Sequence, residues 1–81
     1  MTVASEIEQF IVTELTQGRG IDSVAVDDDL LGTGIVDSHG MMEMVGFLEE
    51  RYGITVDDAD LTPENFQSLA SVEAYVARKR G

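Results

Sequence analysis

The stretch that decides the fold is GTGIVDSHGMMEMVGFLEERYG, residues 32–53. Apolar residues recur within it at helical spacing, namely Met41, Met44, Val45, Leu48 and Tyr52. This spacing places the five side chains on one face of a helix and predicts that the face is buried. The helix is expected to run from about Ser38 to Tyr52. Gly53 suits its C-terminal stop, and either Asp37 or Ser38 suits its N-cap.

A first helix is expected over residues 6–16, because its apolar residues also share one face: Ile7, Phe10, Ile11 and Leu15. Ser5 followed by Glu8 forms a capping-box pattern at its start. Gly18 and Gly20 are expected to end it.

Two helices are expected after the central one. Thr62 reads as an N-cap with Pro63 at the first helical position, and this helix is expected to be short. Ser68 then opens a last helix, whose apolar face consists of Leu69, Val72, Tyr75 and Val76. The predicted fold is therefore all-α: a small four-helix bundle with a long first loop and a short third helix. Residues 24–26 and 54–56 are too short to build a sheet.

The long connection, residues 18–37, contains too many apolar side chains for a freely solvated loop. We expect them to be pinned against the helices, since long structureless loops are uncommon in compact domains. They are Ile21, Val24, Val26, Leu30, Leu31, Ile35 and Val36.

The composition excludes several classes of protein. With 81 residues the chain is expected to form one domain, residues 1–81. It has no cysteine and one histidine, which removes disulfides and thiolate sites and argues against a metal centre. No apolar run is long enough to cross a membrane, and no secretory signal is visible, so a cytoplasmic location is expected.

Charge is the strongest overall signal. Sixteen acidic residues against five basic ones give a net charge of −11. Such a field repels nucleic acid and anionic membranes. It attracts partners that carry basic patches, although acidity also serves solubility alone.

Ser38 invites four interpretations. A hydrolase nucleophile is disfavoured, because His39 points about 100° away on a helix and the G-x-S-x-G pattern is absent. Calcium binding by the aspartates at 27–29 fails at the fifth and twelfth positions of an EF-hand loop, so these residues are expected to form turns. Ser38 is then either a helix cap or an attachment point for a phosphate ester, which a helix N-terminus favours.

The segment LLGTGIVDSHGMMEMVGFLEERYGI, residues 30–54, resembles the phosphopantetheine attachment region of acyl and peptidyl carrier proteins. In that family an Asp-Ser pair, usually followed by leucine, opens the second helix after a glycine-containing loop. The later DLTPENFQSLASVEAYV, residues 60–76, is similar to the family's short third helix and its fourth. The likeness covers about residues 26–76.

The resemblance implies that Ser38 is esterified with 4′-phosphopantetheine from coenzyme A. The thiol of that arm would carry an acyl or aminoacyl group as a thioester, and the protein itself would catalyse nothing. Asp37 matches the family's aspartate. His39 departs from the usual leucine, which puts the identity of the partners in doubt.

The resemblance also assigns partner recognition to the outer face of the central helix, which consists of His39, Met42, Glu43, Gly46 and Glu50. The implied partners are a phosphopantetheinyl transferase, an adenylate-forming ligase or acyltransferase, and a downstream synthase or transferase with a basic docking patch. We expect a free-standing, monomeric type II carrier of a polyketide or nonribosomal peptide pathway. The alternative is an acidic helical interaction module that is never modified.

Overall fold

The computed structural model describes residues 2–16 and 18–80. They form α1 (Val3–Phe10), which continues as a π-helical turn (η1, Ile11–Leu15), then α2 (Ser38–Tyr52), a 3₁₀ turn (η2, Asp58–Asp60), α3 (Pro63–Phe66) and α4 (Leu69–Arg80). These described residues contain no strand, so the predicted all-α fold with four helices, a long first loop and a short third helix is confirmed. None of these helices is long and apolar enough to cross a membrane.

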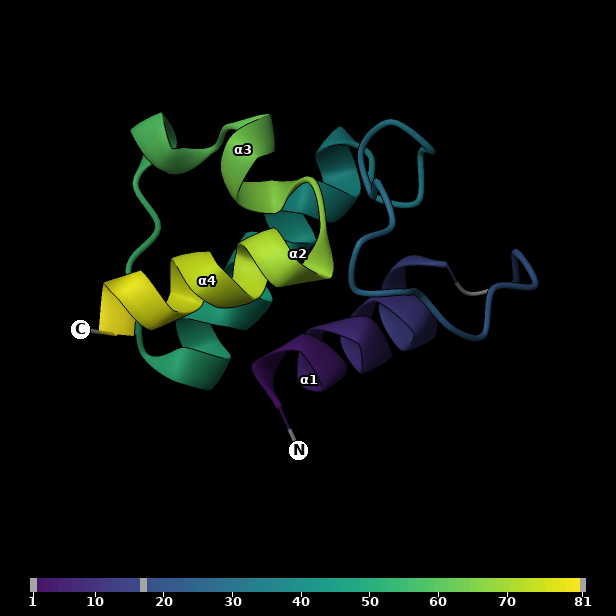
Figure 1. Ribbon diagram of the computed structural model, residues 1–81, viewed down its shortest axis with the longest axis horizontal. Coiled ribbons are helices and arrows are strands. Elements are labelled where there is room, and N and C mark those ends of the chain that lie inside the picture. The colour runs from purple at the N-terminus through teal and green to yellow at the C-terminus, as the bar shows by residue number, and fades with distance from the viewer. Residues whose placement is uncertain (1, 17, 81) are drawn as a thin grey trace.

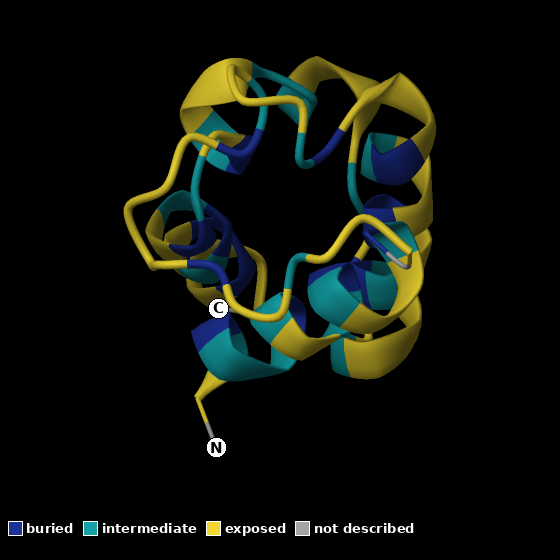
Figure 2. Ribbon diagram, turned by 90° about the vertical axis from the view of Figure 1, so that its right-hand side faces the viewer, coloured by how far each residue is buried: buried dark blue, intermediate teal, exposed yellow. Residues whose placement is uncertain are grey.

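α4 is the element against which the others assemble. It packs on α1, on α3 and on α2. In Figure 1 it lies between α1 below and α3 above, with α2 behind it and the long loop to one side. Figure 2 shows that the buried parts of the helices and of the loop turn toward the centre of the molecule. The core therefore receives side chains from every helix and from the loop: Ile7, Ile11, Leu30, Val36, Met44, Leu48, Phe66, Leu69, Val72 and Val76.

The bounds predicted for α2 are confirmed at both ends. α2 spans Ser38–Tyr52, and Gly53 follows in the left-handed conformation with φ of 67°. Glycine adopts this conformation without the steric cost that a Cβ imposes. The predicted caps of the last two helices are also confirmed in position, because Thr62 precedes α3 and the Ser68 hydroxyl accepts a bond from the Ser71 amide at 3.2 Å.

The start of the first helix was predicted wrongly. The helix begins at Val3, and its capping box pairs Thr2 with Ser5 rather than Ser5 with Glu8. Thr2 is itself a good cap, and the Glu8 carboxylate instead accepts a bond from the Val24 amide at 2.9 Å. A contact with the long loop thus overrides the local pattern.

The long loop is pinned to the core, as predicted, except at one position. Val24, Leu30 and Val36 are buried, whereas Val26 is 56% exposed. The chain turns at this point, with the Asp28 amide donating to the Ala25 carbonyl at 3.1 Å, so the Val26 side chain faces outward. The turn-forming role expected of the aspartates is confirmed for Asp28 and Asp29, whose carboxylates accept backbone bonds from Ala25 and Gly32.

Leu30 fastens the middle of this loop. Its side chain is fully buried, and its amide donates to the carbonyl of Gln67, between α3 and α4, at 2.7 Å. Asp29 on one side of it and Gly32 on the other are exposed. Leu30 is the largest of the three buried apolar residues of the loop, the others being Val24 and Val36, so the loop depends strongly on it.

Two tyrosines tie surface segments together by hydrogen bonds to carboxylates. The Tyr52 hydroxyl donates to Glu6 at 2.6 Å, and Arg51 also donates to Glu6 at 3.1 Å, which links α2 to α1. Both bonds lower the pKa of Glu6 below its usual value, and the bond from Tyr52 has the larger effect. The Tyr75 hydroxyl donates to Asp60 at 2.8 Å and links α4 to η2.

Replacing Leu30 with alanine is expected to lower the free energy of unfolding by about 2–5 kcal/mol, because it leaves a cavity in the core. Chemical denaturation followed by circular dichroism measures this change. Val26→Ala is the matched control in the same loop, and it should change the stability by less than about 0.5 kcal/mol. Equal midpoints for the two variants would contradict the role given to Leu30.

The stability should also fall at alkaline pH. Burial, together with the bond to Asp60, raises the pKa of Tyr75 from 10.0 to about 12. The folded state therefore holds this proton more tightly than the unfolded state, and the resulting stabilisation is complete below pH 10 and disappears as the pH rises toward 12. Thermal melts between pH 8 and 12 should show a smaller loss for Tyr75→Phe than for the natural chain. An identical loss would assign it to other groups.

Candidate functional site

Ser38 stands at the point where the long loop becomes α2. It is the first residue of that helix and is exposed. The helix behind it has 15 residues. The first amides of a helix have no partners within it, so this position combines free N–H groups with the positive end of the helix dipole.

Asp37 is the residue that caps the helix. Its backbone is extended, with φ of −94° and ψ of −172°, and its carboxylate accepts a bond from the Gly40 amide at 2.7 Å. Of the two residues that the sequence allowed as the N-cap, the structure therefore selects Asp37. The Ser38 hydroxyl is not needed to begin the helix.

Arg19 holds the last residues of the loop in place. Its guanidinium donates to the carbonyls of Gly34 at 3.2 Å and of Ile35 at 3.5 Å. It also lines a concave surface together with Asp37 and His39. The sequence does not reveal this role of Arg19, because its partners are 15 and 16 positions away and are backbone atoms that no side-chain pattern indicates.

Gly40 was missed for a similar reason. It is buried, and a Cβ at this position would lie 3.3 Å from the Asp37 carboxylate, which is a tight contact, and 3.4 Å from Leu15 and 3.6 Å from Val36, which are ordinary ones. The glycine therefore leaves room for the carboxylate that caps α2. Only the conformation of Asp37 as the cap reveals this preference.

A groove of about 540 Å³ opens beside Ser38. Its lining is largely apolar and comes from the loop and from the first turns of α2: Leu31, Gly34, Val36, Asp37, Ser38, Met41 and Met42. An extended group attached to the serine oxygen would find an apolar surface there.

His39 is turned away from a role as base for Ser38. Its Nε2 lies 2.7 Å from Oε1 of Glu43, one turn further along α2, and its side chain is 83% exposed. A Ser-His catalytic pair requires the two side chains to be within hydrogen-bond reach. The pairing along the helix instead makes His39 and Glu43 one polar unit on its outer face.

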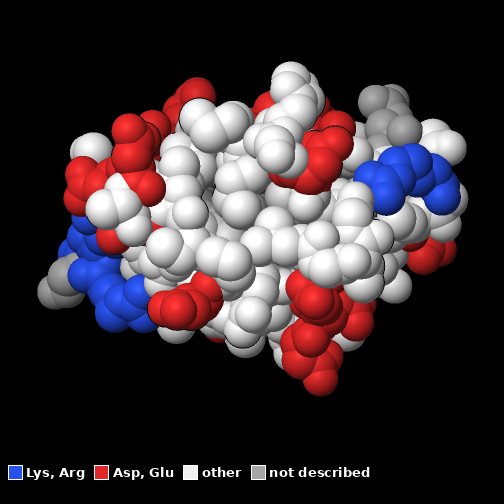
Figure 3. Space-filling model, turned by 90° about the horizontal axis from the view of Figure 1, so that it is seen from above, with Lys and Arg blue, Asp and Glu red and all other residues white. Residues whose placement is uncertain are grey.

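The outer face of α2 is open to solvent. All five residues that the sequence assigned to partner recognition are exposed: His39, Met42, Glu43, Gly46 and Glu50. Met42 is 59% exposed, which is unusual for so apolar a side chain. Figure 3 shows acidic side chains gathered in several clusters around an uncharged area, on the face seen from above, with basic side chains at the two ends.

The comparisons with known proteins agree with this geometry. The family described as "Phosphopantetheine attachment site" matches residues 11–76. The chain is similar to a solved structure described as KstB-PCP in its apo form, with 38% identity over 96% of this chain and 86% of that one, and a TM-score of 0.73. No curated protein matches the sequence closely.

A second structural neighbour is a chain in a crystal structure described as that of an FAD-dependent dehydrogenase. The identity is 27% and the TM-score is 0.79, and the match covers 86% of this chain and 97% of that one. Both TM-scores indicate that these neighbours share the overall fold of this chain.

The position of the cap makes a prediction that separates folding from chemistry at this site. Asp37→Ala should lower the free energy of unfolding by about 1 kcal/mol, because it removes the cap of α2. Ser38→Ala should change it by less than about 0.5 kcal/mol, since that hydroxyl does not cap the helix. Urea denaturation compares the two, and a larger loss for Ser38→Ala would reassign the cap.

Proposed function

The chain belongs to the family of proteins with a phosphopantetheine attachment site, and from this premise we propose that Ser38 receives the arm and that the protein is a carrier of tethered biosynthetic intermediates. The cofactor of such a domain is covalently attached 4′-phosphopantetheine. When bound, it supplies a thiol that holds an acyl or aminoacyl group as a thioester. We propose that the carrier itself catalyses no reaction.

One observation carries the assignment to Ser38: its hydroxyl is exposed at the start of a long helix whose cap is supplied by Asp37. In the modification, the Ser38 oxygen forms an ester bond with the phosphate of the arm. The diphosphate bond of coenzyme A breaks, adenosine 3′,5′-bisphosphate leaves, and the hydroxyl proton passes to a base of the transferase. None of these steps requires α2 to unwind or to lose its cap.

The residues around Ser38 fit the arm. The free amides and the dipole at the start of α2 favour the negative charge of a phosphate ester. The apolar groove beside it, which includes Leu31, Met41 and Met42, suits the uncharged remainder of the arm. The exposed position leaves the thiol end free to reach an enzyme.

We assign partner recognition to the outer face of α2, which consists of His39, Met42, Glu43, Gly46 and Glu50. Met42 offers an adaptable apolar contact that suits several enzymes in turn. Glu43 and Glu50 would meet cations on those enzymes and raise the association rate. The partners are a phosphopantetheinyl transferase, an adenylate-forming ligase or acyltransferase that loads the thiol, and a downstream synthase or transferase with a basic docking patch.

One neighbour favours a nonribosomal peptide type of pathway over a polyketide one. KstB-PCP bears the usual abbreviation of a peptidyl carrier protein, and its sequence is 38% identical to this chain where the two align. The loading enzyme would then be an adenylate-forming ligase, and the cargo an aminoacyl group. The other neighbour adds a flavin-dependent dehydrogenase to the downstream enzymes worth testing.

Intact-protein mass spectrometry tests the assignment to Ser38. Incubation with coenzyme A, Mg²⁺ and a broad-specificity phosphopantetheinyl transferase should add one phosphopantetheine to the natural chain. Ser38→Ala should add none while melting at nearly the same temperature. Ser23→Ala, which changes an exposed serine in the long loop, is the matched control and should be modified like the natural chain.

The alternative, an acidic interaction module that is never modified, makes the opposite prediction. A folded natural chain that gains no mass would support it. A gain that survives in Ser38→Ala would instead place the attachment on another residue and contradict the assignment to Ser38.

A further inference from the structure

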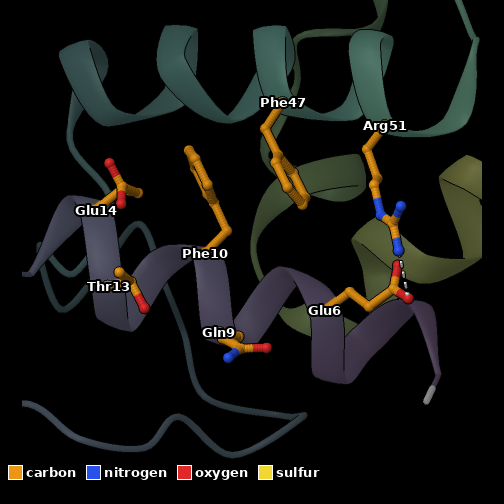
Figure 4. A pocket seen from close by; sticks show the side chains of 7 residues that line it. All are labelled: Glu6, Gln9, Phe10, Thr13, Glu14, Phe47 and Arg51. Atoms are coloured by element: carbon orange, nitrogen blue, oxygen red, sulfur yellow. Dashed lines mark hydrogen bonds and ion pairs between the residues drawn. The ribbon is translucent and has the colours of Figure 1, made fainter.

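A second groove lies between α1 and α2, on the side of α2 away from the attachment groove. Its two lobes, of about 420 and 640 Å³, share Phe10, Phe47 and Arg51 as walls. The two phenylalanine rings stack with their centroids 4.4 Å apart and an angle of 18° between their planes. Figure 4 shows both rings pointing into the space between the helices, with the Glu6–Arg51 pair closing one end.

Gly46 leaves the larger lobe open. It lies in the middle of α2 and is exposed, and a Cβ built there would meet no atom within 4 Å. A glycine inside a helix costs roughly 0.5–1 kcal/mol relative to alanine. Packing within the described residues does not account for this cost. The missing side chain instead lets another molecule approach the Phe10–Phe47 pair closely.

The rim of the groove is acidic. Glu14, Glu43 and Glu50 line it, and Glu43 also contacts His39 at 2.7 Å. Arg51, the one cation among its lining residues, is bound to Glu6 at 3.1 Å. An aromatic floor with carboxylates around it complements an apolar side chain that is flanked by lysine or arginine. A neutral acyl chain would gain nothing from three carboxylates, so the charges favour a protein occupant over the cargo.

We propose that this groove docks a basic surface segment of the enzymes that act on the tethered group, with one phenylalanine or leucine of that segment inserted beside Gly46. The proposal rests on the carrier function. Gly46 lies eight residues after Ser38 on the same helix, which is roughly 12 Å along its axis. An enzyme that holds the groove therefore keeps its active site within reach of an arm attached at Ser38.

Two short peptides test the groove directly. The first is acetyl-Arg-Lys-Phe-Arg-Lys-amide, and the second has alanine in place of phenylalanine. Each is titrated into the ¹⁵N-labelled full chain, both unmodified and phosphopantetheinylated, and followed by NMR. The phenylalanine peptide should shift the amides of Phe10, Gly46 and Phe47 in a saturable way. The alanine peptide should give smaller shifts spread over the acidic surface.

Filling the groove provides the matched variants. Gly46→Leu should melt at the same temperature or higher, because leucine is a better helix former, and should weaken binding of the phenylalanine peptide about tenfold. Ala77→Leu adds the same side chain at an exposed position of α4 and should bind like the natural chain. If only Gly46→Leu loses affinity for the phenylalanine peptide, the loss results from filling the groove and not from a change in the fold.

Several results would overturn the proposal. Equal, diffuse shifts with both peptides would mean that the peptides bind the acidic surface in general and not the groove. Unchanged binding of the phenylalanine peptide by Gly46→Leu would place the contact elsewhere. A third result would assign the groove to cargo. In it, the amides of Phe10, Gly46 and Phe47 do not respond to the peptides and shift only when a benzoyl group is attached to the arm through a stable amide. Because the titration is also read on the unmodified chain, its outcome is independent of whether Ser38 accepts phosphopantetheine.

Discussion

The burial of Leu30 is the interaction on which the rest of this structure depends. More than twenty residues separate the first helical segment from α2, and those among them that the structure describes form no helix or strand. The Leu30 side chain enters the core, and its amide bonds the Gln67 carbonyl between α3 and α4. The Leu30 carbonyl then accepts the Val36 amide at 2.9 Å. Leu30 thus holds the middle of the loop through its side chain and both of its backbone groups, and together with the buried Val36 it positions the residues that lead into Asp37 and Ser38.

Part of the unusual acidity has a structural use. Carboxylates of Glu8, Glu49 and Glu73 accept bonds from the amides of Val24, Val56 and Ala4, at 2.9–3.0 Å. Val24 and Val56 lie in segments without regular structure, and Ala4 lies in the first turn of α1, so none of these amides has a partner within a helix. An acidic side chain on another element satisfies each of them. The net charge therefore serves the fold as well as the surface. The exposed carboxylates on the outer face of α2 and at the rim of the groove between α1 and α2 are the ones that we assign to partners.

The start of α2 divides two tasks between adjacent residues. Asp37 satisfies the backbone at the helix terminus, and Ser38 is left exposed. A serine that both capped the helix and carried the arm would have to release its backbone bond whenever it was modified. With the tasks separated, the same bundle can persist before and after modification, and the enzymes that visit the carrier meet the same outer face of α2 throughout.

The sequence by itself determined the features that depend on near neighbours. The bounds of α2, its glycine stop, the short third helix and the apolar face of α4 follow from helical periodicity and capping chemistry within a few residues. The motif around Ser38 was readable for the same reason. Only the tertiary structure decided between Asp37 and Ser38 as the cap, turned Val26 outward, drew Glu8 away from a capping box, and brought Phe10 against Phe47. The positions of Glu8 and of the two phenylalanines depend on contacts between residues far apart in the chain, whose free energies exceed local preferences of a few tenths of a kcal/mol to about 1 kcal/mol. The cap and the turn at Val26 are made by bonds within three residues, but aspartate and serine cap a helix about equally well, so the local pattern does not choose between them.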